Sequence, residues 1–177
     1  MRQYPMPMPF GWFQVAWSDE IEVGVPTPLY YFGRHLVAWR DDEGTAHVWD
    51  AFCAHLGAHL GFRSTIDGTT ITCPLHGWKY GENGRCIDIP YSDRVNRQAA
   101  IRTFAVCERN GTLLAWYHPS ADVEPGWDPP ELEEFGEEGE FSEVFRQHYR
   151  LGCHWQEIAE TQVDAAHIQA QDRKSVV

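Results

Sequence analysis

Closely spaced turn signals divide the stretch from Trp12 to about Tyr117 into short segments. The signals combine Asp, Asn and Gly, which favour tight turns, at Asp41 to Gly44, Asp67-Gly68, Glu82 to Gly84 and Asn110-Gly111. The segments between them are rich in β-branched and aromatic residues, which favour strands. They include Tyr30 to Phe32, Leu36 to Trp39, Ala46 to Trp49, "TTITC", "RCIDI", "IRTFAVCE" and "TLLAWYH". We therefore predict a small, mainly β domain built as a meander of antiparallel strands.

Composition limits the class of protein and of partner. With 177 residues the chain has the size of one domain, or of one domain and the opening of another. Its 43% hydrophobic and 14% aromatic residues are typical of a folded globular protein. A net charge of -12 argues against nucleic acid and anionic membranes as partners, because both would repel such a surface. A basic protein partner suits this charge better.

The N-terminal residues "MRQYPMPMPF" carry prolines where a signal peptide needs a continuous apolar helix. No run in the sequence reaches the roughly 18 apolar residues that a membrane span requires. We therefore expect a cytoplasmic protein with no membrane span.

The composition changes after the β-rich stretch. Residues 118–140 are rich in Pro, Gly and Glu and show no sustained periodicity, which is typical of a linker. Beyond it, "FSEVFRQHYRL" alternates like a strand and "HWQEIAETQVDAAHIQAQ" has helical composition. The predicted organisation is a β domain at 1–117, an acidic linker at 118–140 and the start of a second domain at 141–177. About 37 residues cannot enclose a sizeable core of their own.

Two short loops each offer one thiol and one imidazole. They are Cys53-x-His55 and, after seventeen residues, Cys73-x-x-His76. Two cysteines and two histidines fit either a structural zinc or a [2Fe-2S] cluster with both thiolates on one iron and both imidazoles on the other. The mixed pairing and the glycines that follow each histidine favour the cluster, and metal analysis would separate the two. Cys86, Cys107 and Cys153 are expected to be small buried hydrophobes, and His59 an ordinary loop histidine.

The two loops, "CAHLGAHL" and "CPLHGWKY", resemble those of the Rieske [2Fe-2S] domain, and the stretch from about Trp12 to Tyr117 is similar to that fold. The resemblance implies that Cys53, His55, Cys73 and His76 bind the cluster. Ala58 and Leu75 stand where cytochrome-type Rieske proteins carry an extra disulfide, and Trp78 stands where they carry a serine. With fewer hydrogen bonds to sulfur, a potential at the lower end for Rieske centres is expected.

The stretch "WQEIAETQVDAAH" is similar to the start of the α+β catalytic domain of Rieske non-haem iron oxygenases. The resemblance implies a catalytic pair, with His167 as a ligand of a mononuclear Fe(II) that activates O2 and Asp164 as a bridge to a Rieske histidine of the next subunit of a homotrimer. With "IDIPYS", the pattern looks most like the oxygenase components that act on steroids, the 3-ketosteroid 9α-hydroxylases and cholesterol 7-desaturases. These hydroxylate or desaturate apolar substrates with electrons from an NAD(P)H-dependent flavin or ferredoxin reductase.

The end of the sequence departs from this family. Its second histidine would fall about five residues after His167, where Asp172 stands, and no place remains for the third, carboxylate ligand. We therefore expect an oxygenase cut short in which electron transfer is intact and oxygenation is not. The alternative is a stand-alone Rieske ferredoxin. The residues from Phe141 onward favour the oxygenase, because a ferredoxin has no use for Asp164 and His167.

Overall fold

The computed structural model describes residues 7–96, 98–135 and 144–163. The chain divides into two compact units, one of Met8–Phe141 and one of Ser142–Val177 with Met1–Pro7. Among the described residues the first unit holds eleven strands in three antiparallel sheets, which confirms the predicted mainly β fold.

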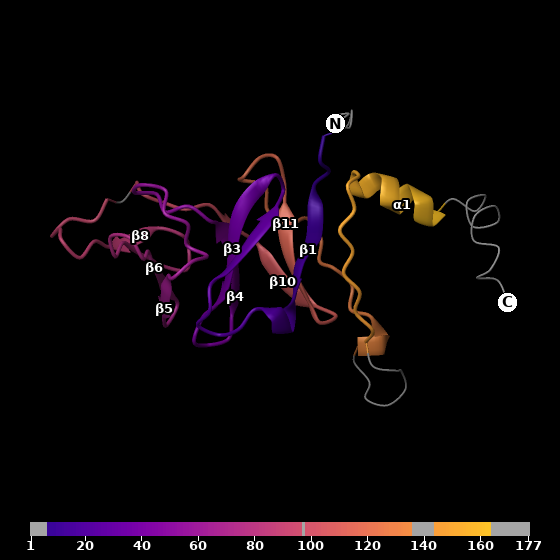
Figure 1. Cartoon of the computed structure of the whole chain (residues 1–177), viewed down its shortest axis with the longest axis horizontal. Helices are drawn as coiled ribbons and strands as arrows, with labels where there is room; N and C mark the ends of the chain where they lie inside the picture. The colour runs from indigo at the N-terminus through magenta and orange to yellow at the C-terminus, as the bar shows by residue number, and fades with distance from the viewer. Residues whose placement is uncertain (1–6, 97, 136–143, 164–177) are drawn as a thin grey trace. The chain divides into compact units, whose positions relative to one another are not determined.

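Most neighbouring strands in the three sheets follow each other in sequence, but β1 pairs with β11 and β4 pairs with β9 (Figure 1). The first sheet has the order β1-β11-β10, from Gly11–Trp17, Thr112–Tyr117 and Val106–Arg109. The second has the order β2-β3-β4-β9, from Thr27–Tyr31, Arg34–Arg40, Ala46–Asp50 and Thr103–Phe104. The third has the order β5-β6-β7-β8, from Thr65–Asp67, Thr70–Thr72, Lys79–Tyr80 and Cys86–Asp88. Both cysteine–histidine loops border this third sheet.

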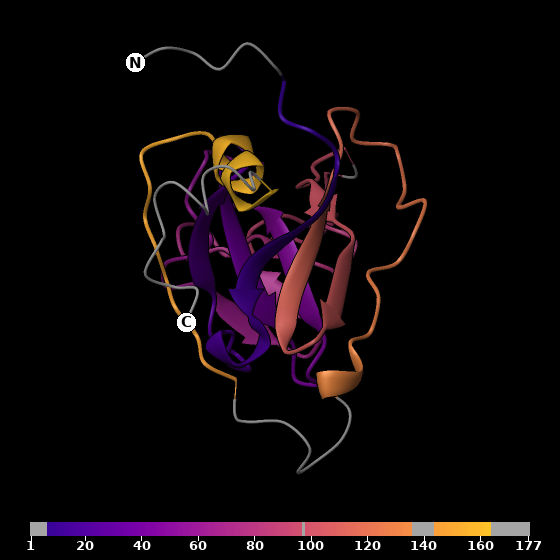
Figure 2. The ribbon, with the colours of Figure 1, turned by 90° about the vertical axis from the view of Figure 1, so that its right-hand side faces the viewer.

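Alternation along β3 and β4 sends side chains into two separate cores, as the two-residue period of a strand requires. Leu36, Ala38 and Val48 enter a core shared with β1 and β11, strands that Figure 2 shows beside the purple strands of the second sheet. Val37, Trp39 and Trp49 enter the other core, which also contains Leu60, Ile71, Tyr80, Cys53 and Cys73. The second core therefore connects the central sheet to the two cysteines.

Asp41 organises the turn between β3 and β4. Its carboxylate is buried and accepts hydrogen bonds from the N–H groups of Glu43 and Thr45 at 3.1 and 2.8 Å. It also lies 2.9 Å from Nε2 of His47, whose ring stacks on Trp39 at 4.1 Å. The turn predicted at this place is thus tied to the core by a buried polar network.

The segment after β11, predicted as a linker, follows the β unit as far as it is described. The indole N–H of Trp12 donates to the carbonyl of Trp127 at 2.7 Å, and the indole N–H of Trp116 donates to that of Val123 at 2.9 Å. Asn110 accepts the N–H of Leu132 at 2.9 Å, just before the 3-10 helix η2 (Glu133–Phe135). The boundaries placed at 117 and 140 stay a prediction.

The second unit contains one helix in its described part, α1 (Trp155–Val163), inside the range predicted to be helical. The strand expected from "FSEVFRQHYRL" is not formed over residues 144–151, all of which are exposed. Alternation alone does not make a strand, because a strand needs a neighbour to receive its hydrogen bonds, and no described strand pairs with this segment. Asp164 and His167 lie outside the described residues. No helix in the described parts is long and apolar enough to cross a membrane.

Candidate metal centre

The first loop leaves β4 and closes on itself through backbone hydrogen bonds. The N–H of Cys53 donates to the carbonyl of Ala58 at 2.9 Å, and the N–H of Gly57 donates to the carbonyl of Cys53 at 3.0 Å. Gly57 has φ +71°, a left-handed conformation that glycine adopts without a steric penalty. The loop therefore turns sharply at Gly57, two residues after His55.

The second loop, between β6 and β7, repeats this pattern. The N–H of Cys73 donates to the carbonyl of Trp78 at 2.9 Å, the N–H of Gly77 donates to that of Cys73 at 3.1 Å, and Gly77 has φ +70°. The two loops thus share one backbone geometry, although their cysteine–histidine spacings differ by one residue. Each loop presents one thiol and one imidazole.

The two thiols lie together in the core. Cys53 is 4% exposed and Cys73 is 3% exposed. Burial raises the pKa of Cys73, and the neighbouring Cys53 thiol raises it further. Metal binding takes thiolates, so a metal at this place has to displace the protons of both groups.

The two imidazoles form the second half of the site. The rings of His55 and His76 lie 4.8 Å apart, centroid to centroid, at an interplanar angle of 70°. The Nδ1 atoms of both rings are buried and have no hydrogen-bond partner in the described structure. Such an unpartnered buried nitrogen costs free energy unless something binds it. Two unpartnered nitrogens on neighbouring imidazole rings are the donor set that ligation of one iron by two histidines requires.

The pairing of like groups bears on the choice between a structural zinc and a [2Fe-2S] cluster. A structural zinc takes four ligands around a single ion. The four candidate ligands are instead divided into a thiol pair and an imidazole pair, which fits a cluster of two irons.

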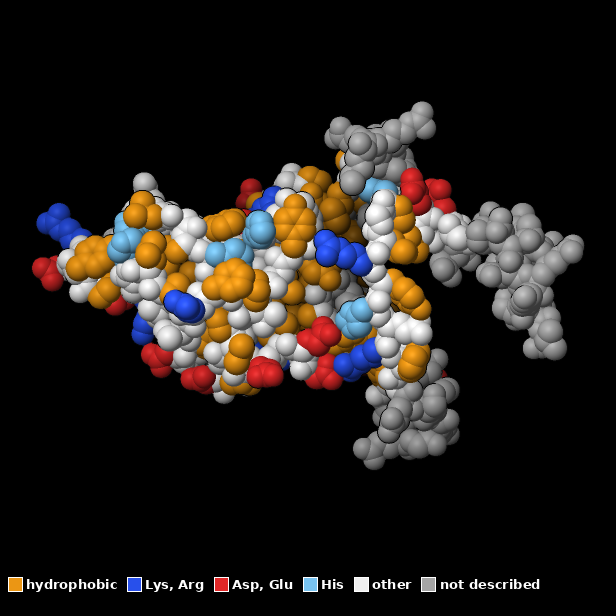
Figure 3. Space-filling model, viewed as in Figure 1, with side chains coloured by type: hydrophobic (Ala, Val, Ile, Leu, Met, Phe, Trp, Pro, Cys, Tyr) orange, Lys and Arg blue, Asp and Glu red, His pale blue; other side chains and the backbone are white. Residues whose placement is uncertain are grey.

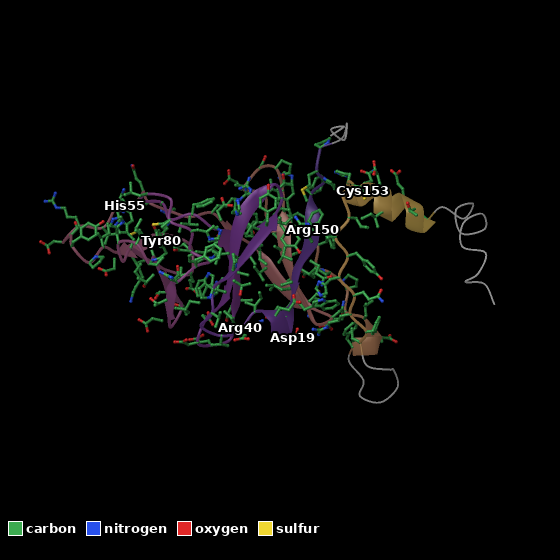
Figure 4. The ribbon with its side chains drawn as sticks, viewed as in Figure 1. Asp19, Arg40, His55, Tyr80, Arg150 and Cys153 are labelled. Atoms are coloured by element: carbon green, nitrogen blue, oxygen red, sulfur yellow. The ribbon has the colours of Figure 1, made fainter. Side chains whose placement is uncertain are left out.

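Tyr80 is a functional residue that the sequence analysis missed. Its hydroxyl oxygen lies 3.0 Å from Sγ of Cys53 and accepts the N–H of Ala54 at 3.2 Å. The side chain is fully buried, and burial raises its pKa, so the phenol keeps its proton and can donate it to a thiolate sulfur. Figure 4 labels Tyr80 and His55 in the same end of the β unit. Tyr80 is the last residue of the quoted motif "CPLHGWKY". Its position just after the second loop is the one feature of the sequence that could have indicated a role.

Trp78 occupies the position of the missing serine. Its indole ring stacks on His55 at a centroid distance of 4.5 Å and an interplanar angle of 4°, and its N–H donates to the hydroxyl of Tyr91 at 2.6 Å. The indole N–H is therefore directed to a tyrosine and not to a cysteine sulfur. Leu56 and Leu75, each next to a loop histidine, are exposed, and apolar side chains surround pale blue histidines at this end in Figure 3.

The remaining cysteines and His59 serve the structure differently. Cys86 is buried, which raises its pKa, and its thiol donates to the carbonyl of Asp88 at 3.5 Å. The prediction of a small buried hydrophobe is confirmed for Cys86. It was wrong for Cys107, which is half-buried, and for Cys153, which is exposed. Cys153 lies in a bend just before α1. Nδ1 of His59 accepts the N–H of Gly61 at 3.0 Å.

Comparison with known proteins assigns the family. Residues 11–105 match the model of the Rieske [2Fe-2S] domain. The chain belongs to this family. The Rieske domain is defined by its [2Fe-2S] cluster, and the matched range contains Cys53, His55, Cys73 and His76.

Proteins similar to this Rieske chain are named as a desaturase, as the oxygenase component of a monooxygenase and as a dioxygenase. A cholesterol 7-desaturase of Bombyx mori is 37% identical over 98% of the chain and 37% of the relative. The oxygenase component of a 3-ketosteroid-9-alpha-monooxygenase of Rhodococcus rhodochrous is 35% identical over 89% of the chain and 41% of the relative. A structure of the complex between oxygenase and ferredoxin in carbazole 1,9a-dioxygenase is 30% identical, with a TM-score of 0.54 over 70% of the chain and 30% of the solved chain. The chain spans about two fifths of the length of these curated relatives.

Proposed function

We propose that Cys53 and Cys73 hold one iron of a [2Fe-2S] cluster and that His55 and His76 hold the other. The observation that carries this assignment is the sorting of the four side chains into a buried thiol pair and an imidazole pair with unpartnered Nδ1 atoms. A Rieske cluster, when bound, accepts and releases one electron at a time.

The surrounding side chains suit this role. The hydroxyl of Tyr80 lies 3.0 Å from the sulfur of Cys53 and, once that sulfur is a thiolate, donates a hydrogen bond that favours the more negative, reduced state. The buried core under the thiols excludes water from the sulfur side. The histidines are only half-buried, so electrons have a short way between the site and the protein surface.

The finer proposal is that this Rieske unit serves an oxygenase. Electrons would enter from an NAD(P)H-dependent flavin or ferredoxin reductase and leave to a mononuclear Fe(II) for O2-dependent hydroxylation or desaturation of an apolar, steroid-like substrate. The names of the relatives support this substrate class, and the carbazole dioxygenase complex with ferredoxin supports a protein electron donor. The cytoplasmic location expected from the sequence stays a prediction.

We assign Asp164 and His167 to the electron exit and to the mononuclear iron on family resemblance alone, as we do the homotrimer. A mononuclear oxygenase site takes two histidines and one carboxylate. Because His167 is the one ligand that can be assigned here, these 177 residues are expected to exchange electrons without oxygenating a substrate by themselves.

A stand-alone Rieske ferredoxin is the second candidate. The observation in its favour is that Met8–Phe141 forms a compact unit of its own, as an independent electron carrier requires. The relatives favour the oxygenase, because the 98% of the chain that aligns with the cholesterol 7-desaturase includes the segment after this unit.

The experiment uses the purified chain reconstituted with iron and sulfide. A reductase with NADH should reduce the cluster in a cycle that air reverses, while a panel of 3-ketosteroids and sterols should give no oxygenated or desaturated product by mass spectrometry. Product that depends on NADH and is lost in His167→Ala would overturn the electron-transfer proposal. A chain that binds zinc and no sulfide would overturn the cluster itself.

A further inference from the structure

The indole of Trp78 lies between a proposed iron ligand and the protein surface. One side of its ring system faces the imidazole of His55 in a nearly parallel stack at 4.5 Å, and its N–H donates to the hydroxyl of Tyr91 at 2.6 Å. Trp78 is 7% exposed and Tyr91 is 61% exposed. One hydrogen bond therefore links a surface phenol to a buried ring that covers the ligand.

The two histidines differ in this respect. His55 has the parallel indole on one face, and its other ring contact is the tilted ring of His76. For His76, the ring contact found in the described structure is the one with His55. The stack on Trp78 thus singles out one of the two imidazoles.

Tyr91 is held in place by its own turn. Ile89 is buried in the core, and the N–H of Ser92 donates to the carbonyl of Ile89 at 3.0 Å. Pro90 packs so closely on the second loop that a Cβ on Gly77 would lie 2.9 Å from Cγ of Pro90. Although the phenol is exposed, the backbone that carries it is fixed against the loop of Cys73 and His76.

We propose that Trp78 and Tyr91 are a positioning pair that fixes the plane of the His55 imidazole at the cluster. The inference rests on the proposed ligand role of His55. An imidazole bound through one nitrogen can still tilt about that bond, and a parallel indole stacked on one of its faces restricts this motion. The indole is restrained in turn by Tyr91, because a buried N–H that loses its acceptor pays the cost of desolvation.

The pair predicts a specific result for single and double variants. Tyr91→Phe removes the acceptor and keeps the ring, while Trp78→Phe removes the donor and much of the stacking surface. Each should alter the nitrogen hyperfine couplings of one histidine in pulsed electron paramagnetic resonance of the reduced protein, and leave those of the other unchanged. Tyr91→Phe should also speed cluster loss to a chelator by about fivefold, the factor for about one lost hydrogen bond. In a Trp78→Phe background, Tyr91→Phe should add little, because the two act as a unit.

Trp12→Phe is the matched control. It also removes an indole N–H that donates a hydrogen bond, here to the backbone carbonyl of Trp127 at 2.7 Å. Trp12 lies in the first sheet. It should leave both sets of nitrogen couplings and the rate of cluster loss at their wild-type values.

Three results would count against the pair. Unchanged couplings in Tyr91→Phe and Trp78→Phe, with lower thermal stability, would show a merely structural contact and overturn the inference. Additive effects in the double variant would show that the two residues act separately and overturn it as well. If the wild-type protein itself lacks two histidine nitrogens at its cluster, the ligand assignment fails first, and the inference with it.

Discussion

The hydroxyl oxygen of Tyr80 lies 3.0 Å from Sγ of Cys53, between that sulfur and the backbone N–H of Ala54. With the thiol protonated, either group can donate in this contact. In the cluster-bound protein Cys53 is a thiolate, which accepts this hydrogen bond.

Tyr80→Phe should therefore lower the reduction potential of the cluster. The lost bond stabilises the reduced, more negative state more than the oxidised one. One hydrogen bond of about 1 kcal/mol corresponds to about 40 mV for one electron. A redox titration measures the shift, with Tyr117→Phe, which changes a phenol of the first sheet, as the control expected to show none. A potential that rises or stays unchanged in Tyr80→Phe would contradict the role given to the hydroxyl.

Cys73→Ala and Cys86→Ala form a matched pair. Both thiols are buried in the same core, and burial raises the pKa of each. Cys73 shares its loop with a histidine and lies within hydrogen-bond reach of the Cys53 thiol, whereas Cys86 lies on β8. Cys73→Ala should abolish cluster binding, whereas Cys86→Ala should retain iron and acid-labile sulfide at the wild-type level. Loss of the cluster in both, with the fold intact by circular dichroism, would place Cys86 among the ligands.

Gly57→Ala and Gly77→Ala should differ in cost although their φ values, +71° and +70°, are nearly equal. Alanine pays about 1 kcal/mol or more in this left-handed region at either place. A Cβ at position 57 meets no atom within 4 Å, whereas one at 77 would lie 2.9 Å from Cγ of Pro90. Urea unfolding should show the larger loss of stability in Gly77→Ala. Equal losses would mean that Pro90 moves aside freely.

Features of the fold that depend on residues close together in the sequence can be predicted from it, and those that depend on distant residues cannot. The short strands and the turns follow from local residue types, and the ligand loops follow from their spacing. The pairing of β1 with β11 joins residues about a hundred positions apart, which no local pattern reveals. Phe32 was expected to end a strand, but it has φ +58° and stacks on Tyr117 at 4.7 Å. Phe32 and Gly33 form the two-residue turn between β2 and β3, and a type I′ turn of this length requires positive φ at both positions.

In the candidate site, too, the local features could be predicted from the sequence and the long-range contacts could not. The two loops signal four ligands, because metal chemistry restricts the residue types and their spacing. The contact of Tyr80 with Cys53 spans 27 positions, and that of Trp78 with Tyr91 joins two strand-connecting segments. Neither contact has a periodic signature. The expected strand at 141–151 needed a neighbouring strand, and the described residues supply none.

Asp41 should make stability depend on pH. Burial by itself raises its pKa, but hydrogen bonds from His47 and from the N–H groups of Thr45 and Glu43 outweigh burial and lower it. The folded protein thus binds this proton less tightly than the unfolded chain. The contribution is present above the ordinary carboxyl pKa and is lost as the pH falls below about 4.

Asp41→Asn should therefore destabilise the protein by roughly 1–3 kcal/mol at pH 7, and by less as the pH approaches 3. Urea unfolding across this range measures the difference. Asp42→Asn is the control, because the exposed Asp42 carboxylate accepts one backbone N–H, that of Gly68 at 2.8 Å, and should change stability by less than about 1 kcal/mol. A difference in unfolding free energy between the wild type and Asp41→Asn that stays constant with pH would contradict the ionised network.

The most direct test of the account is electron paramagnetic resonance of the dithionite-reduced protein, combined with iron and sulfide analysis. Two irons and two sulfides per chain, with a Rieske-type spectrum that carries hyperfine coupling from two histidine nitrogens, are the predicted result. The signal should disappear in Cys53→Ala and in Cys73→Ala. A spectrum of the type given by all-cysteine clusters, or a chain that holds zinc without sulfide, would contradict the assignment of Cys53, His55, Cys73 and His76.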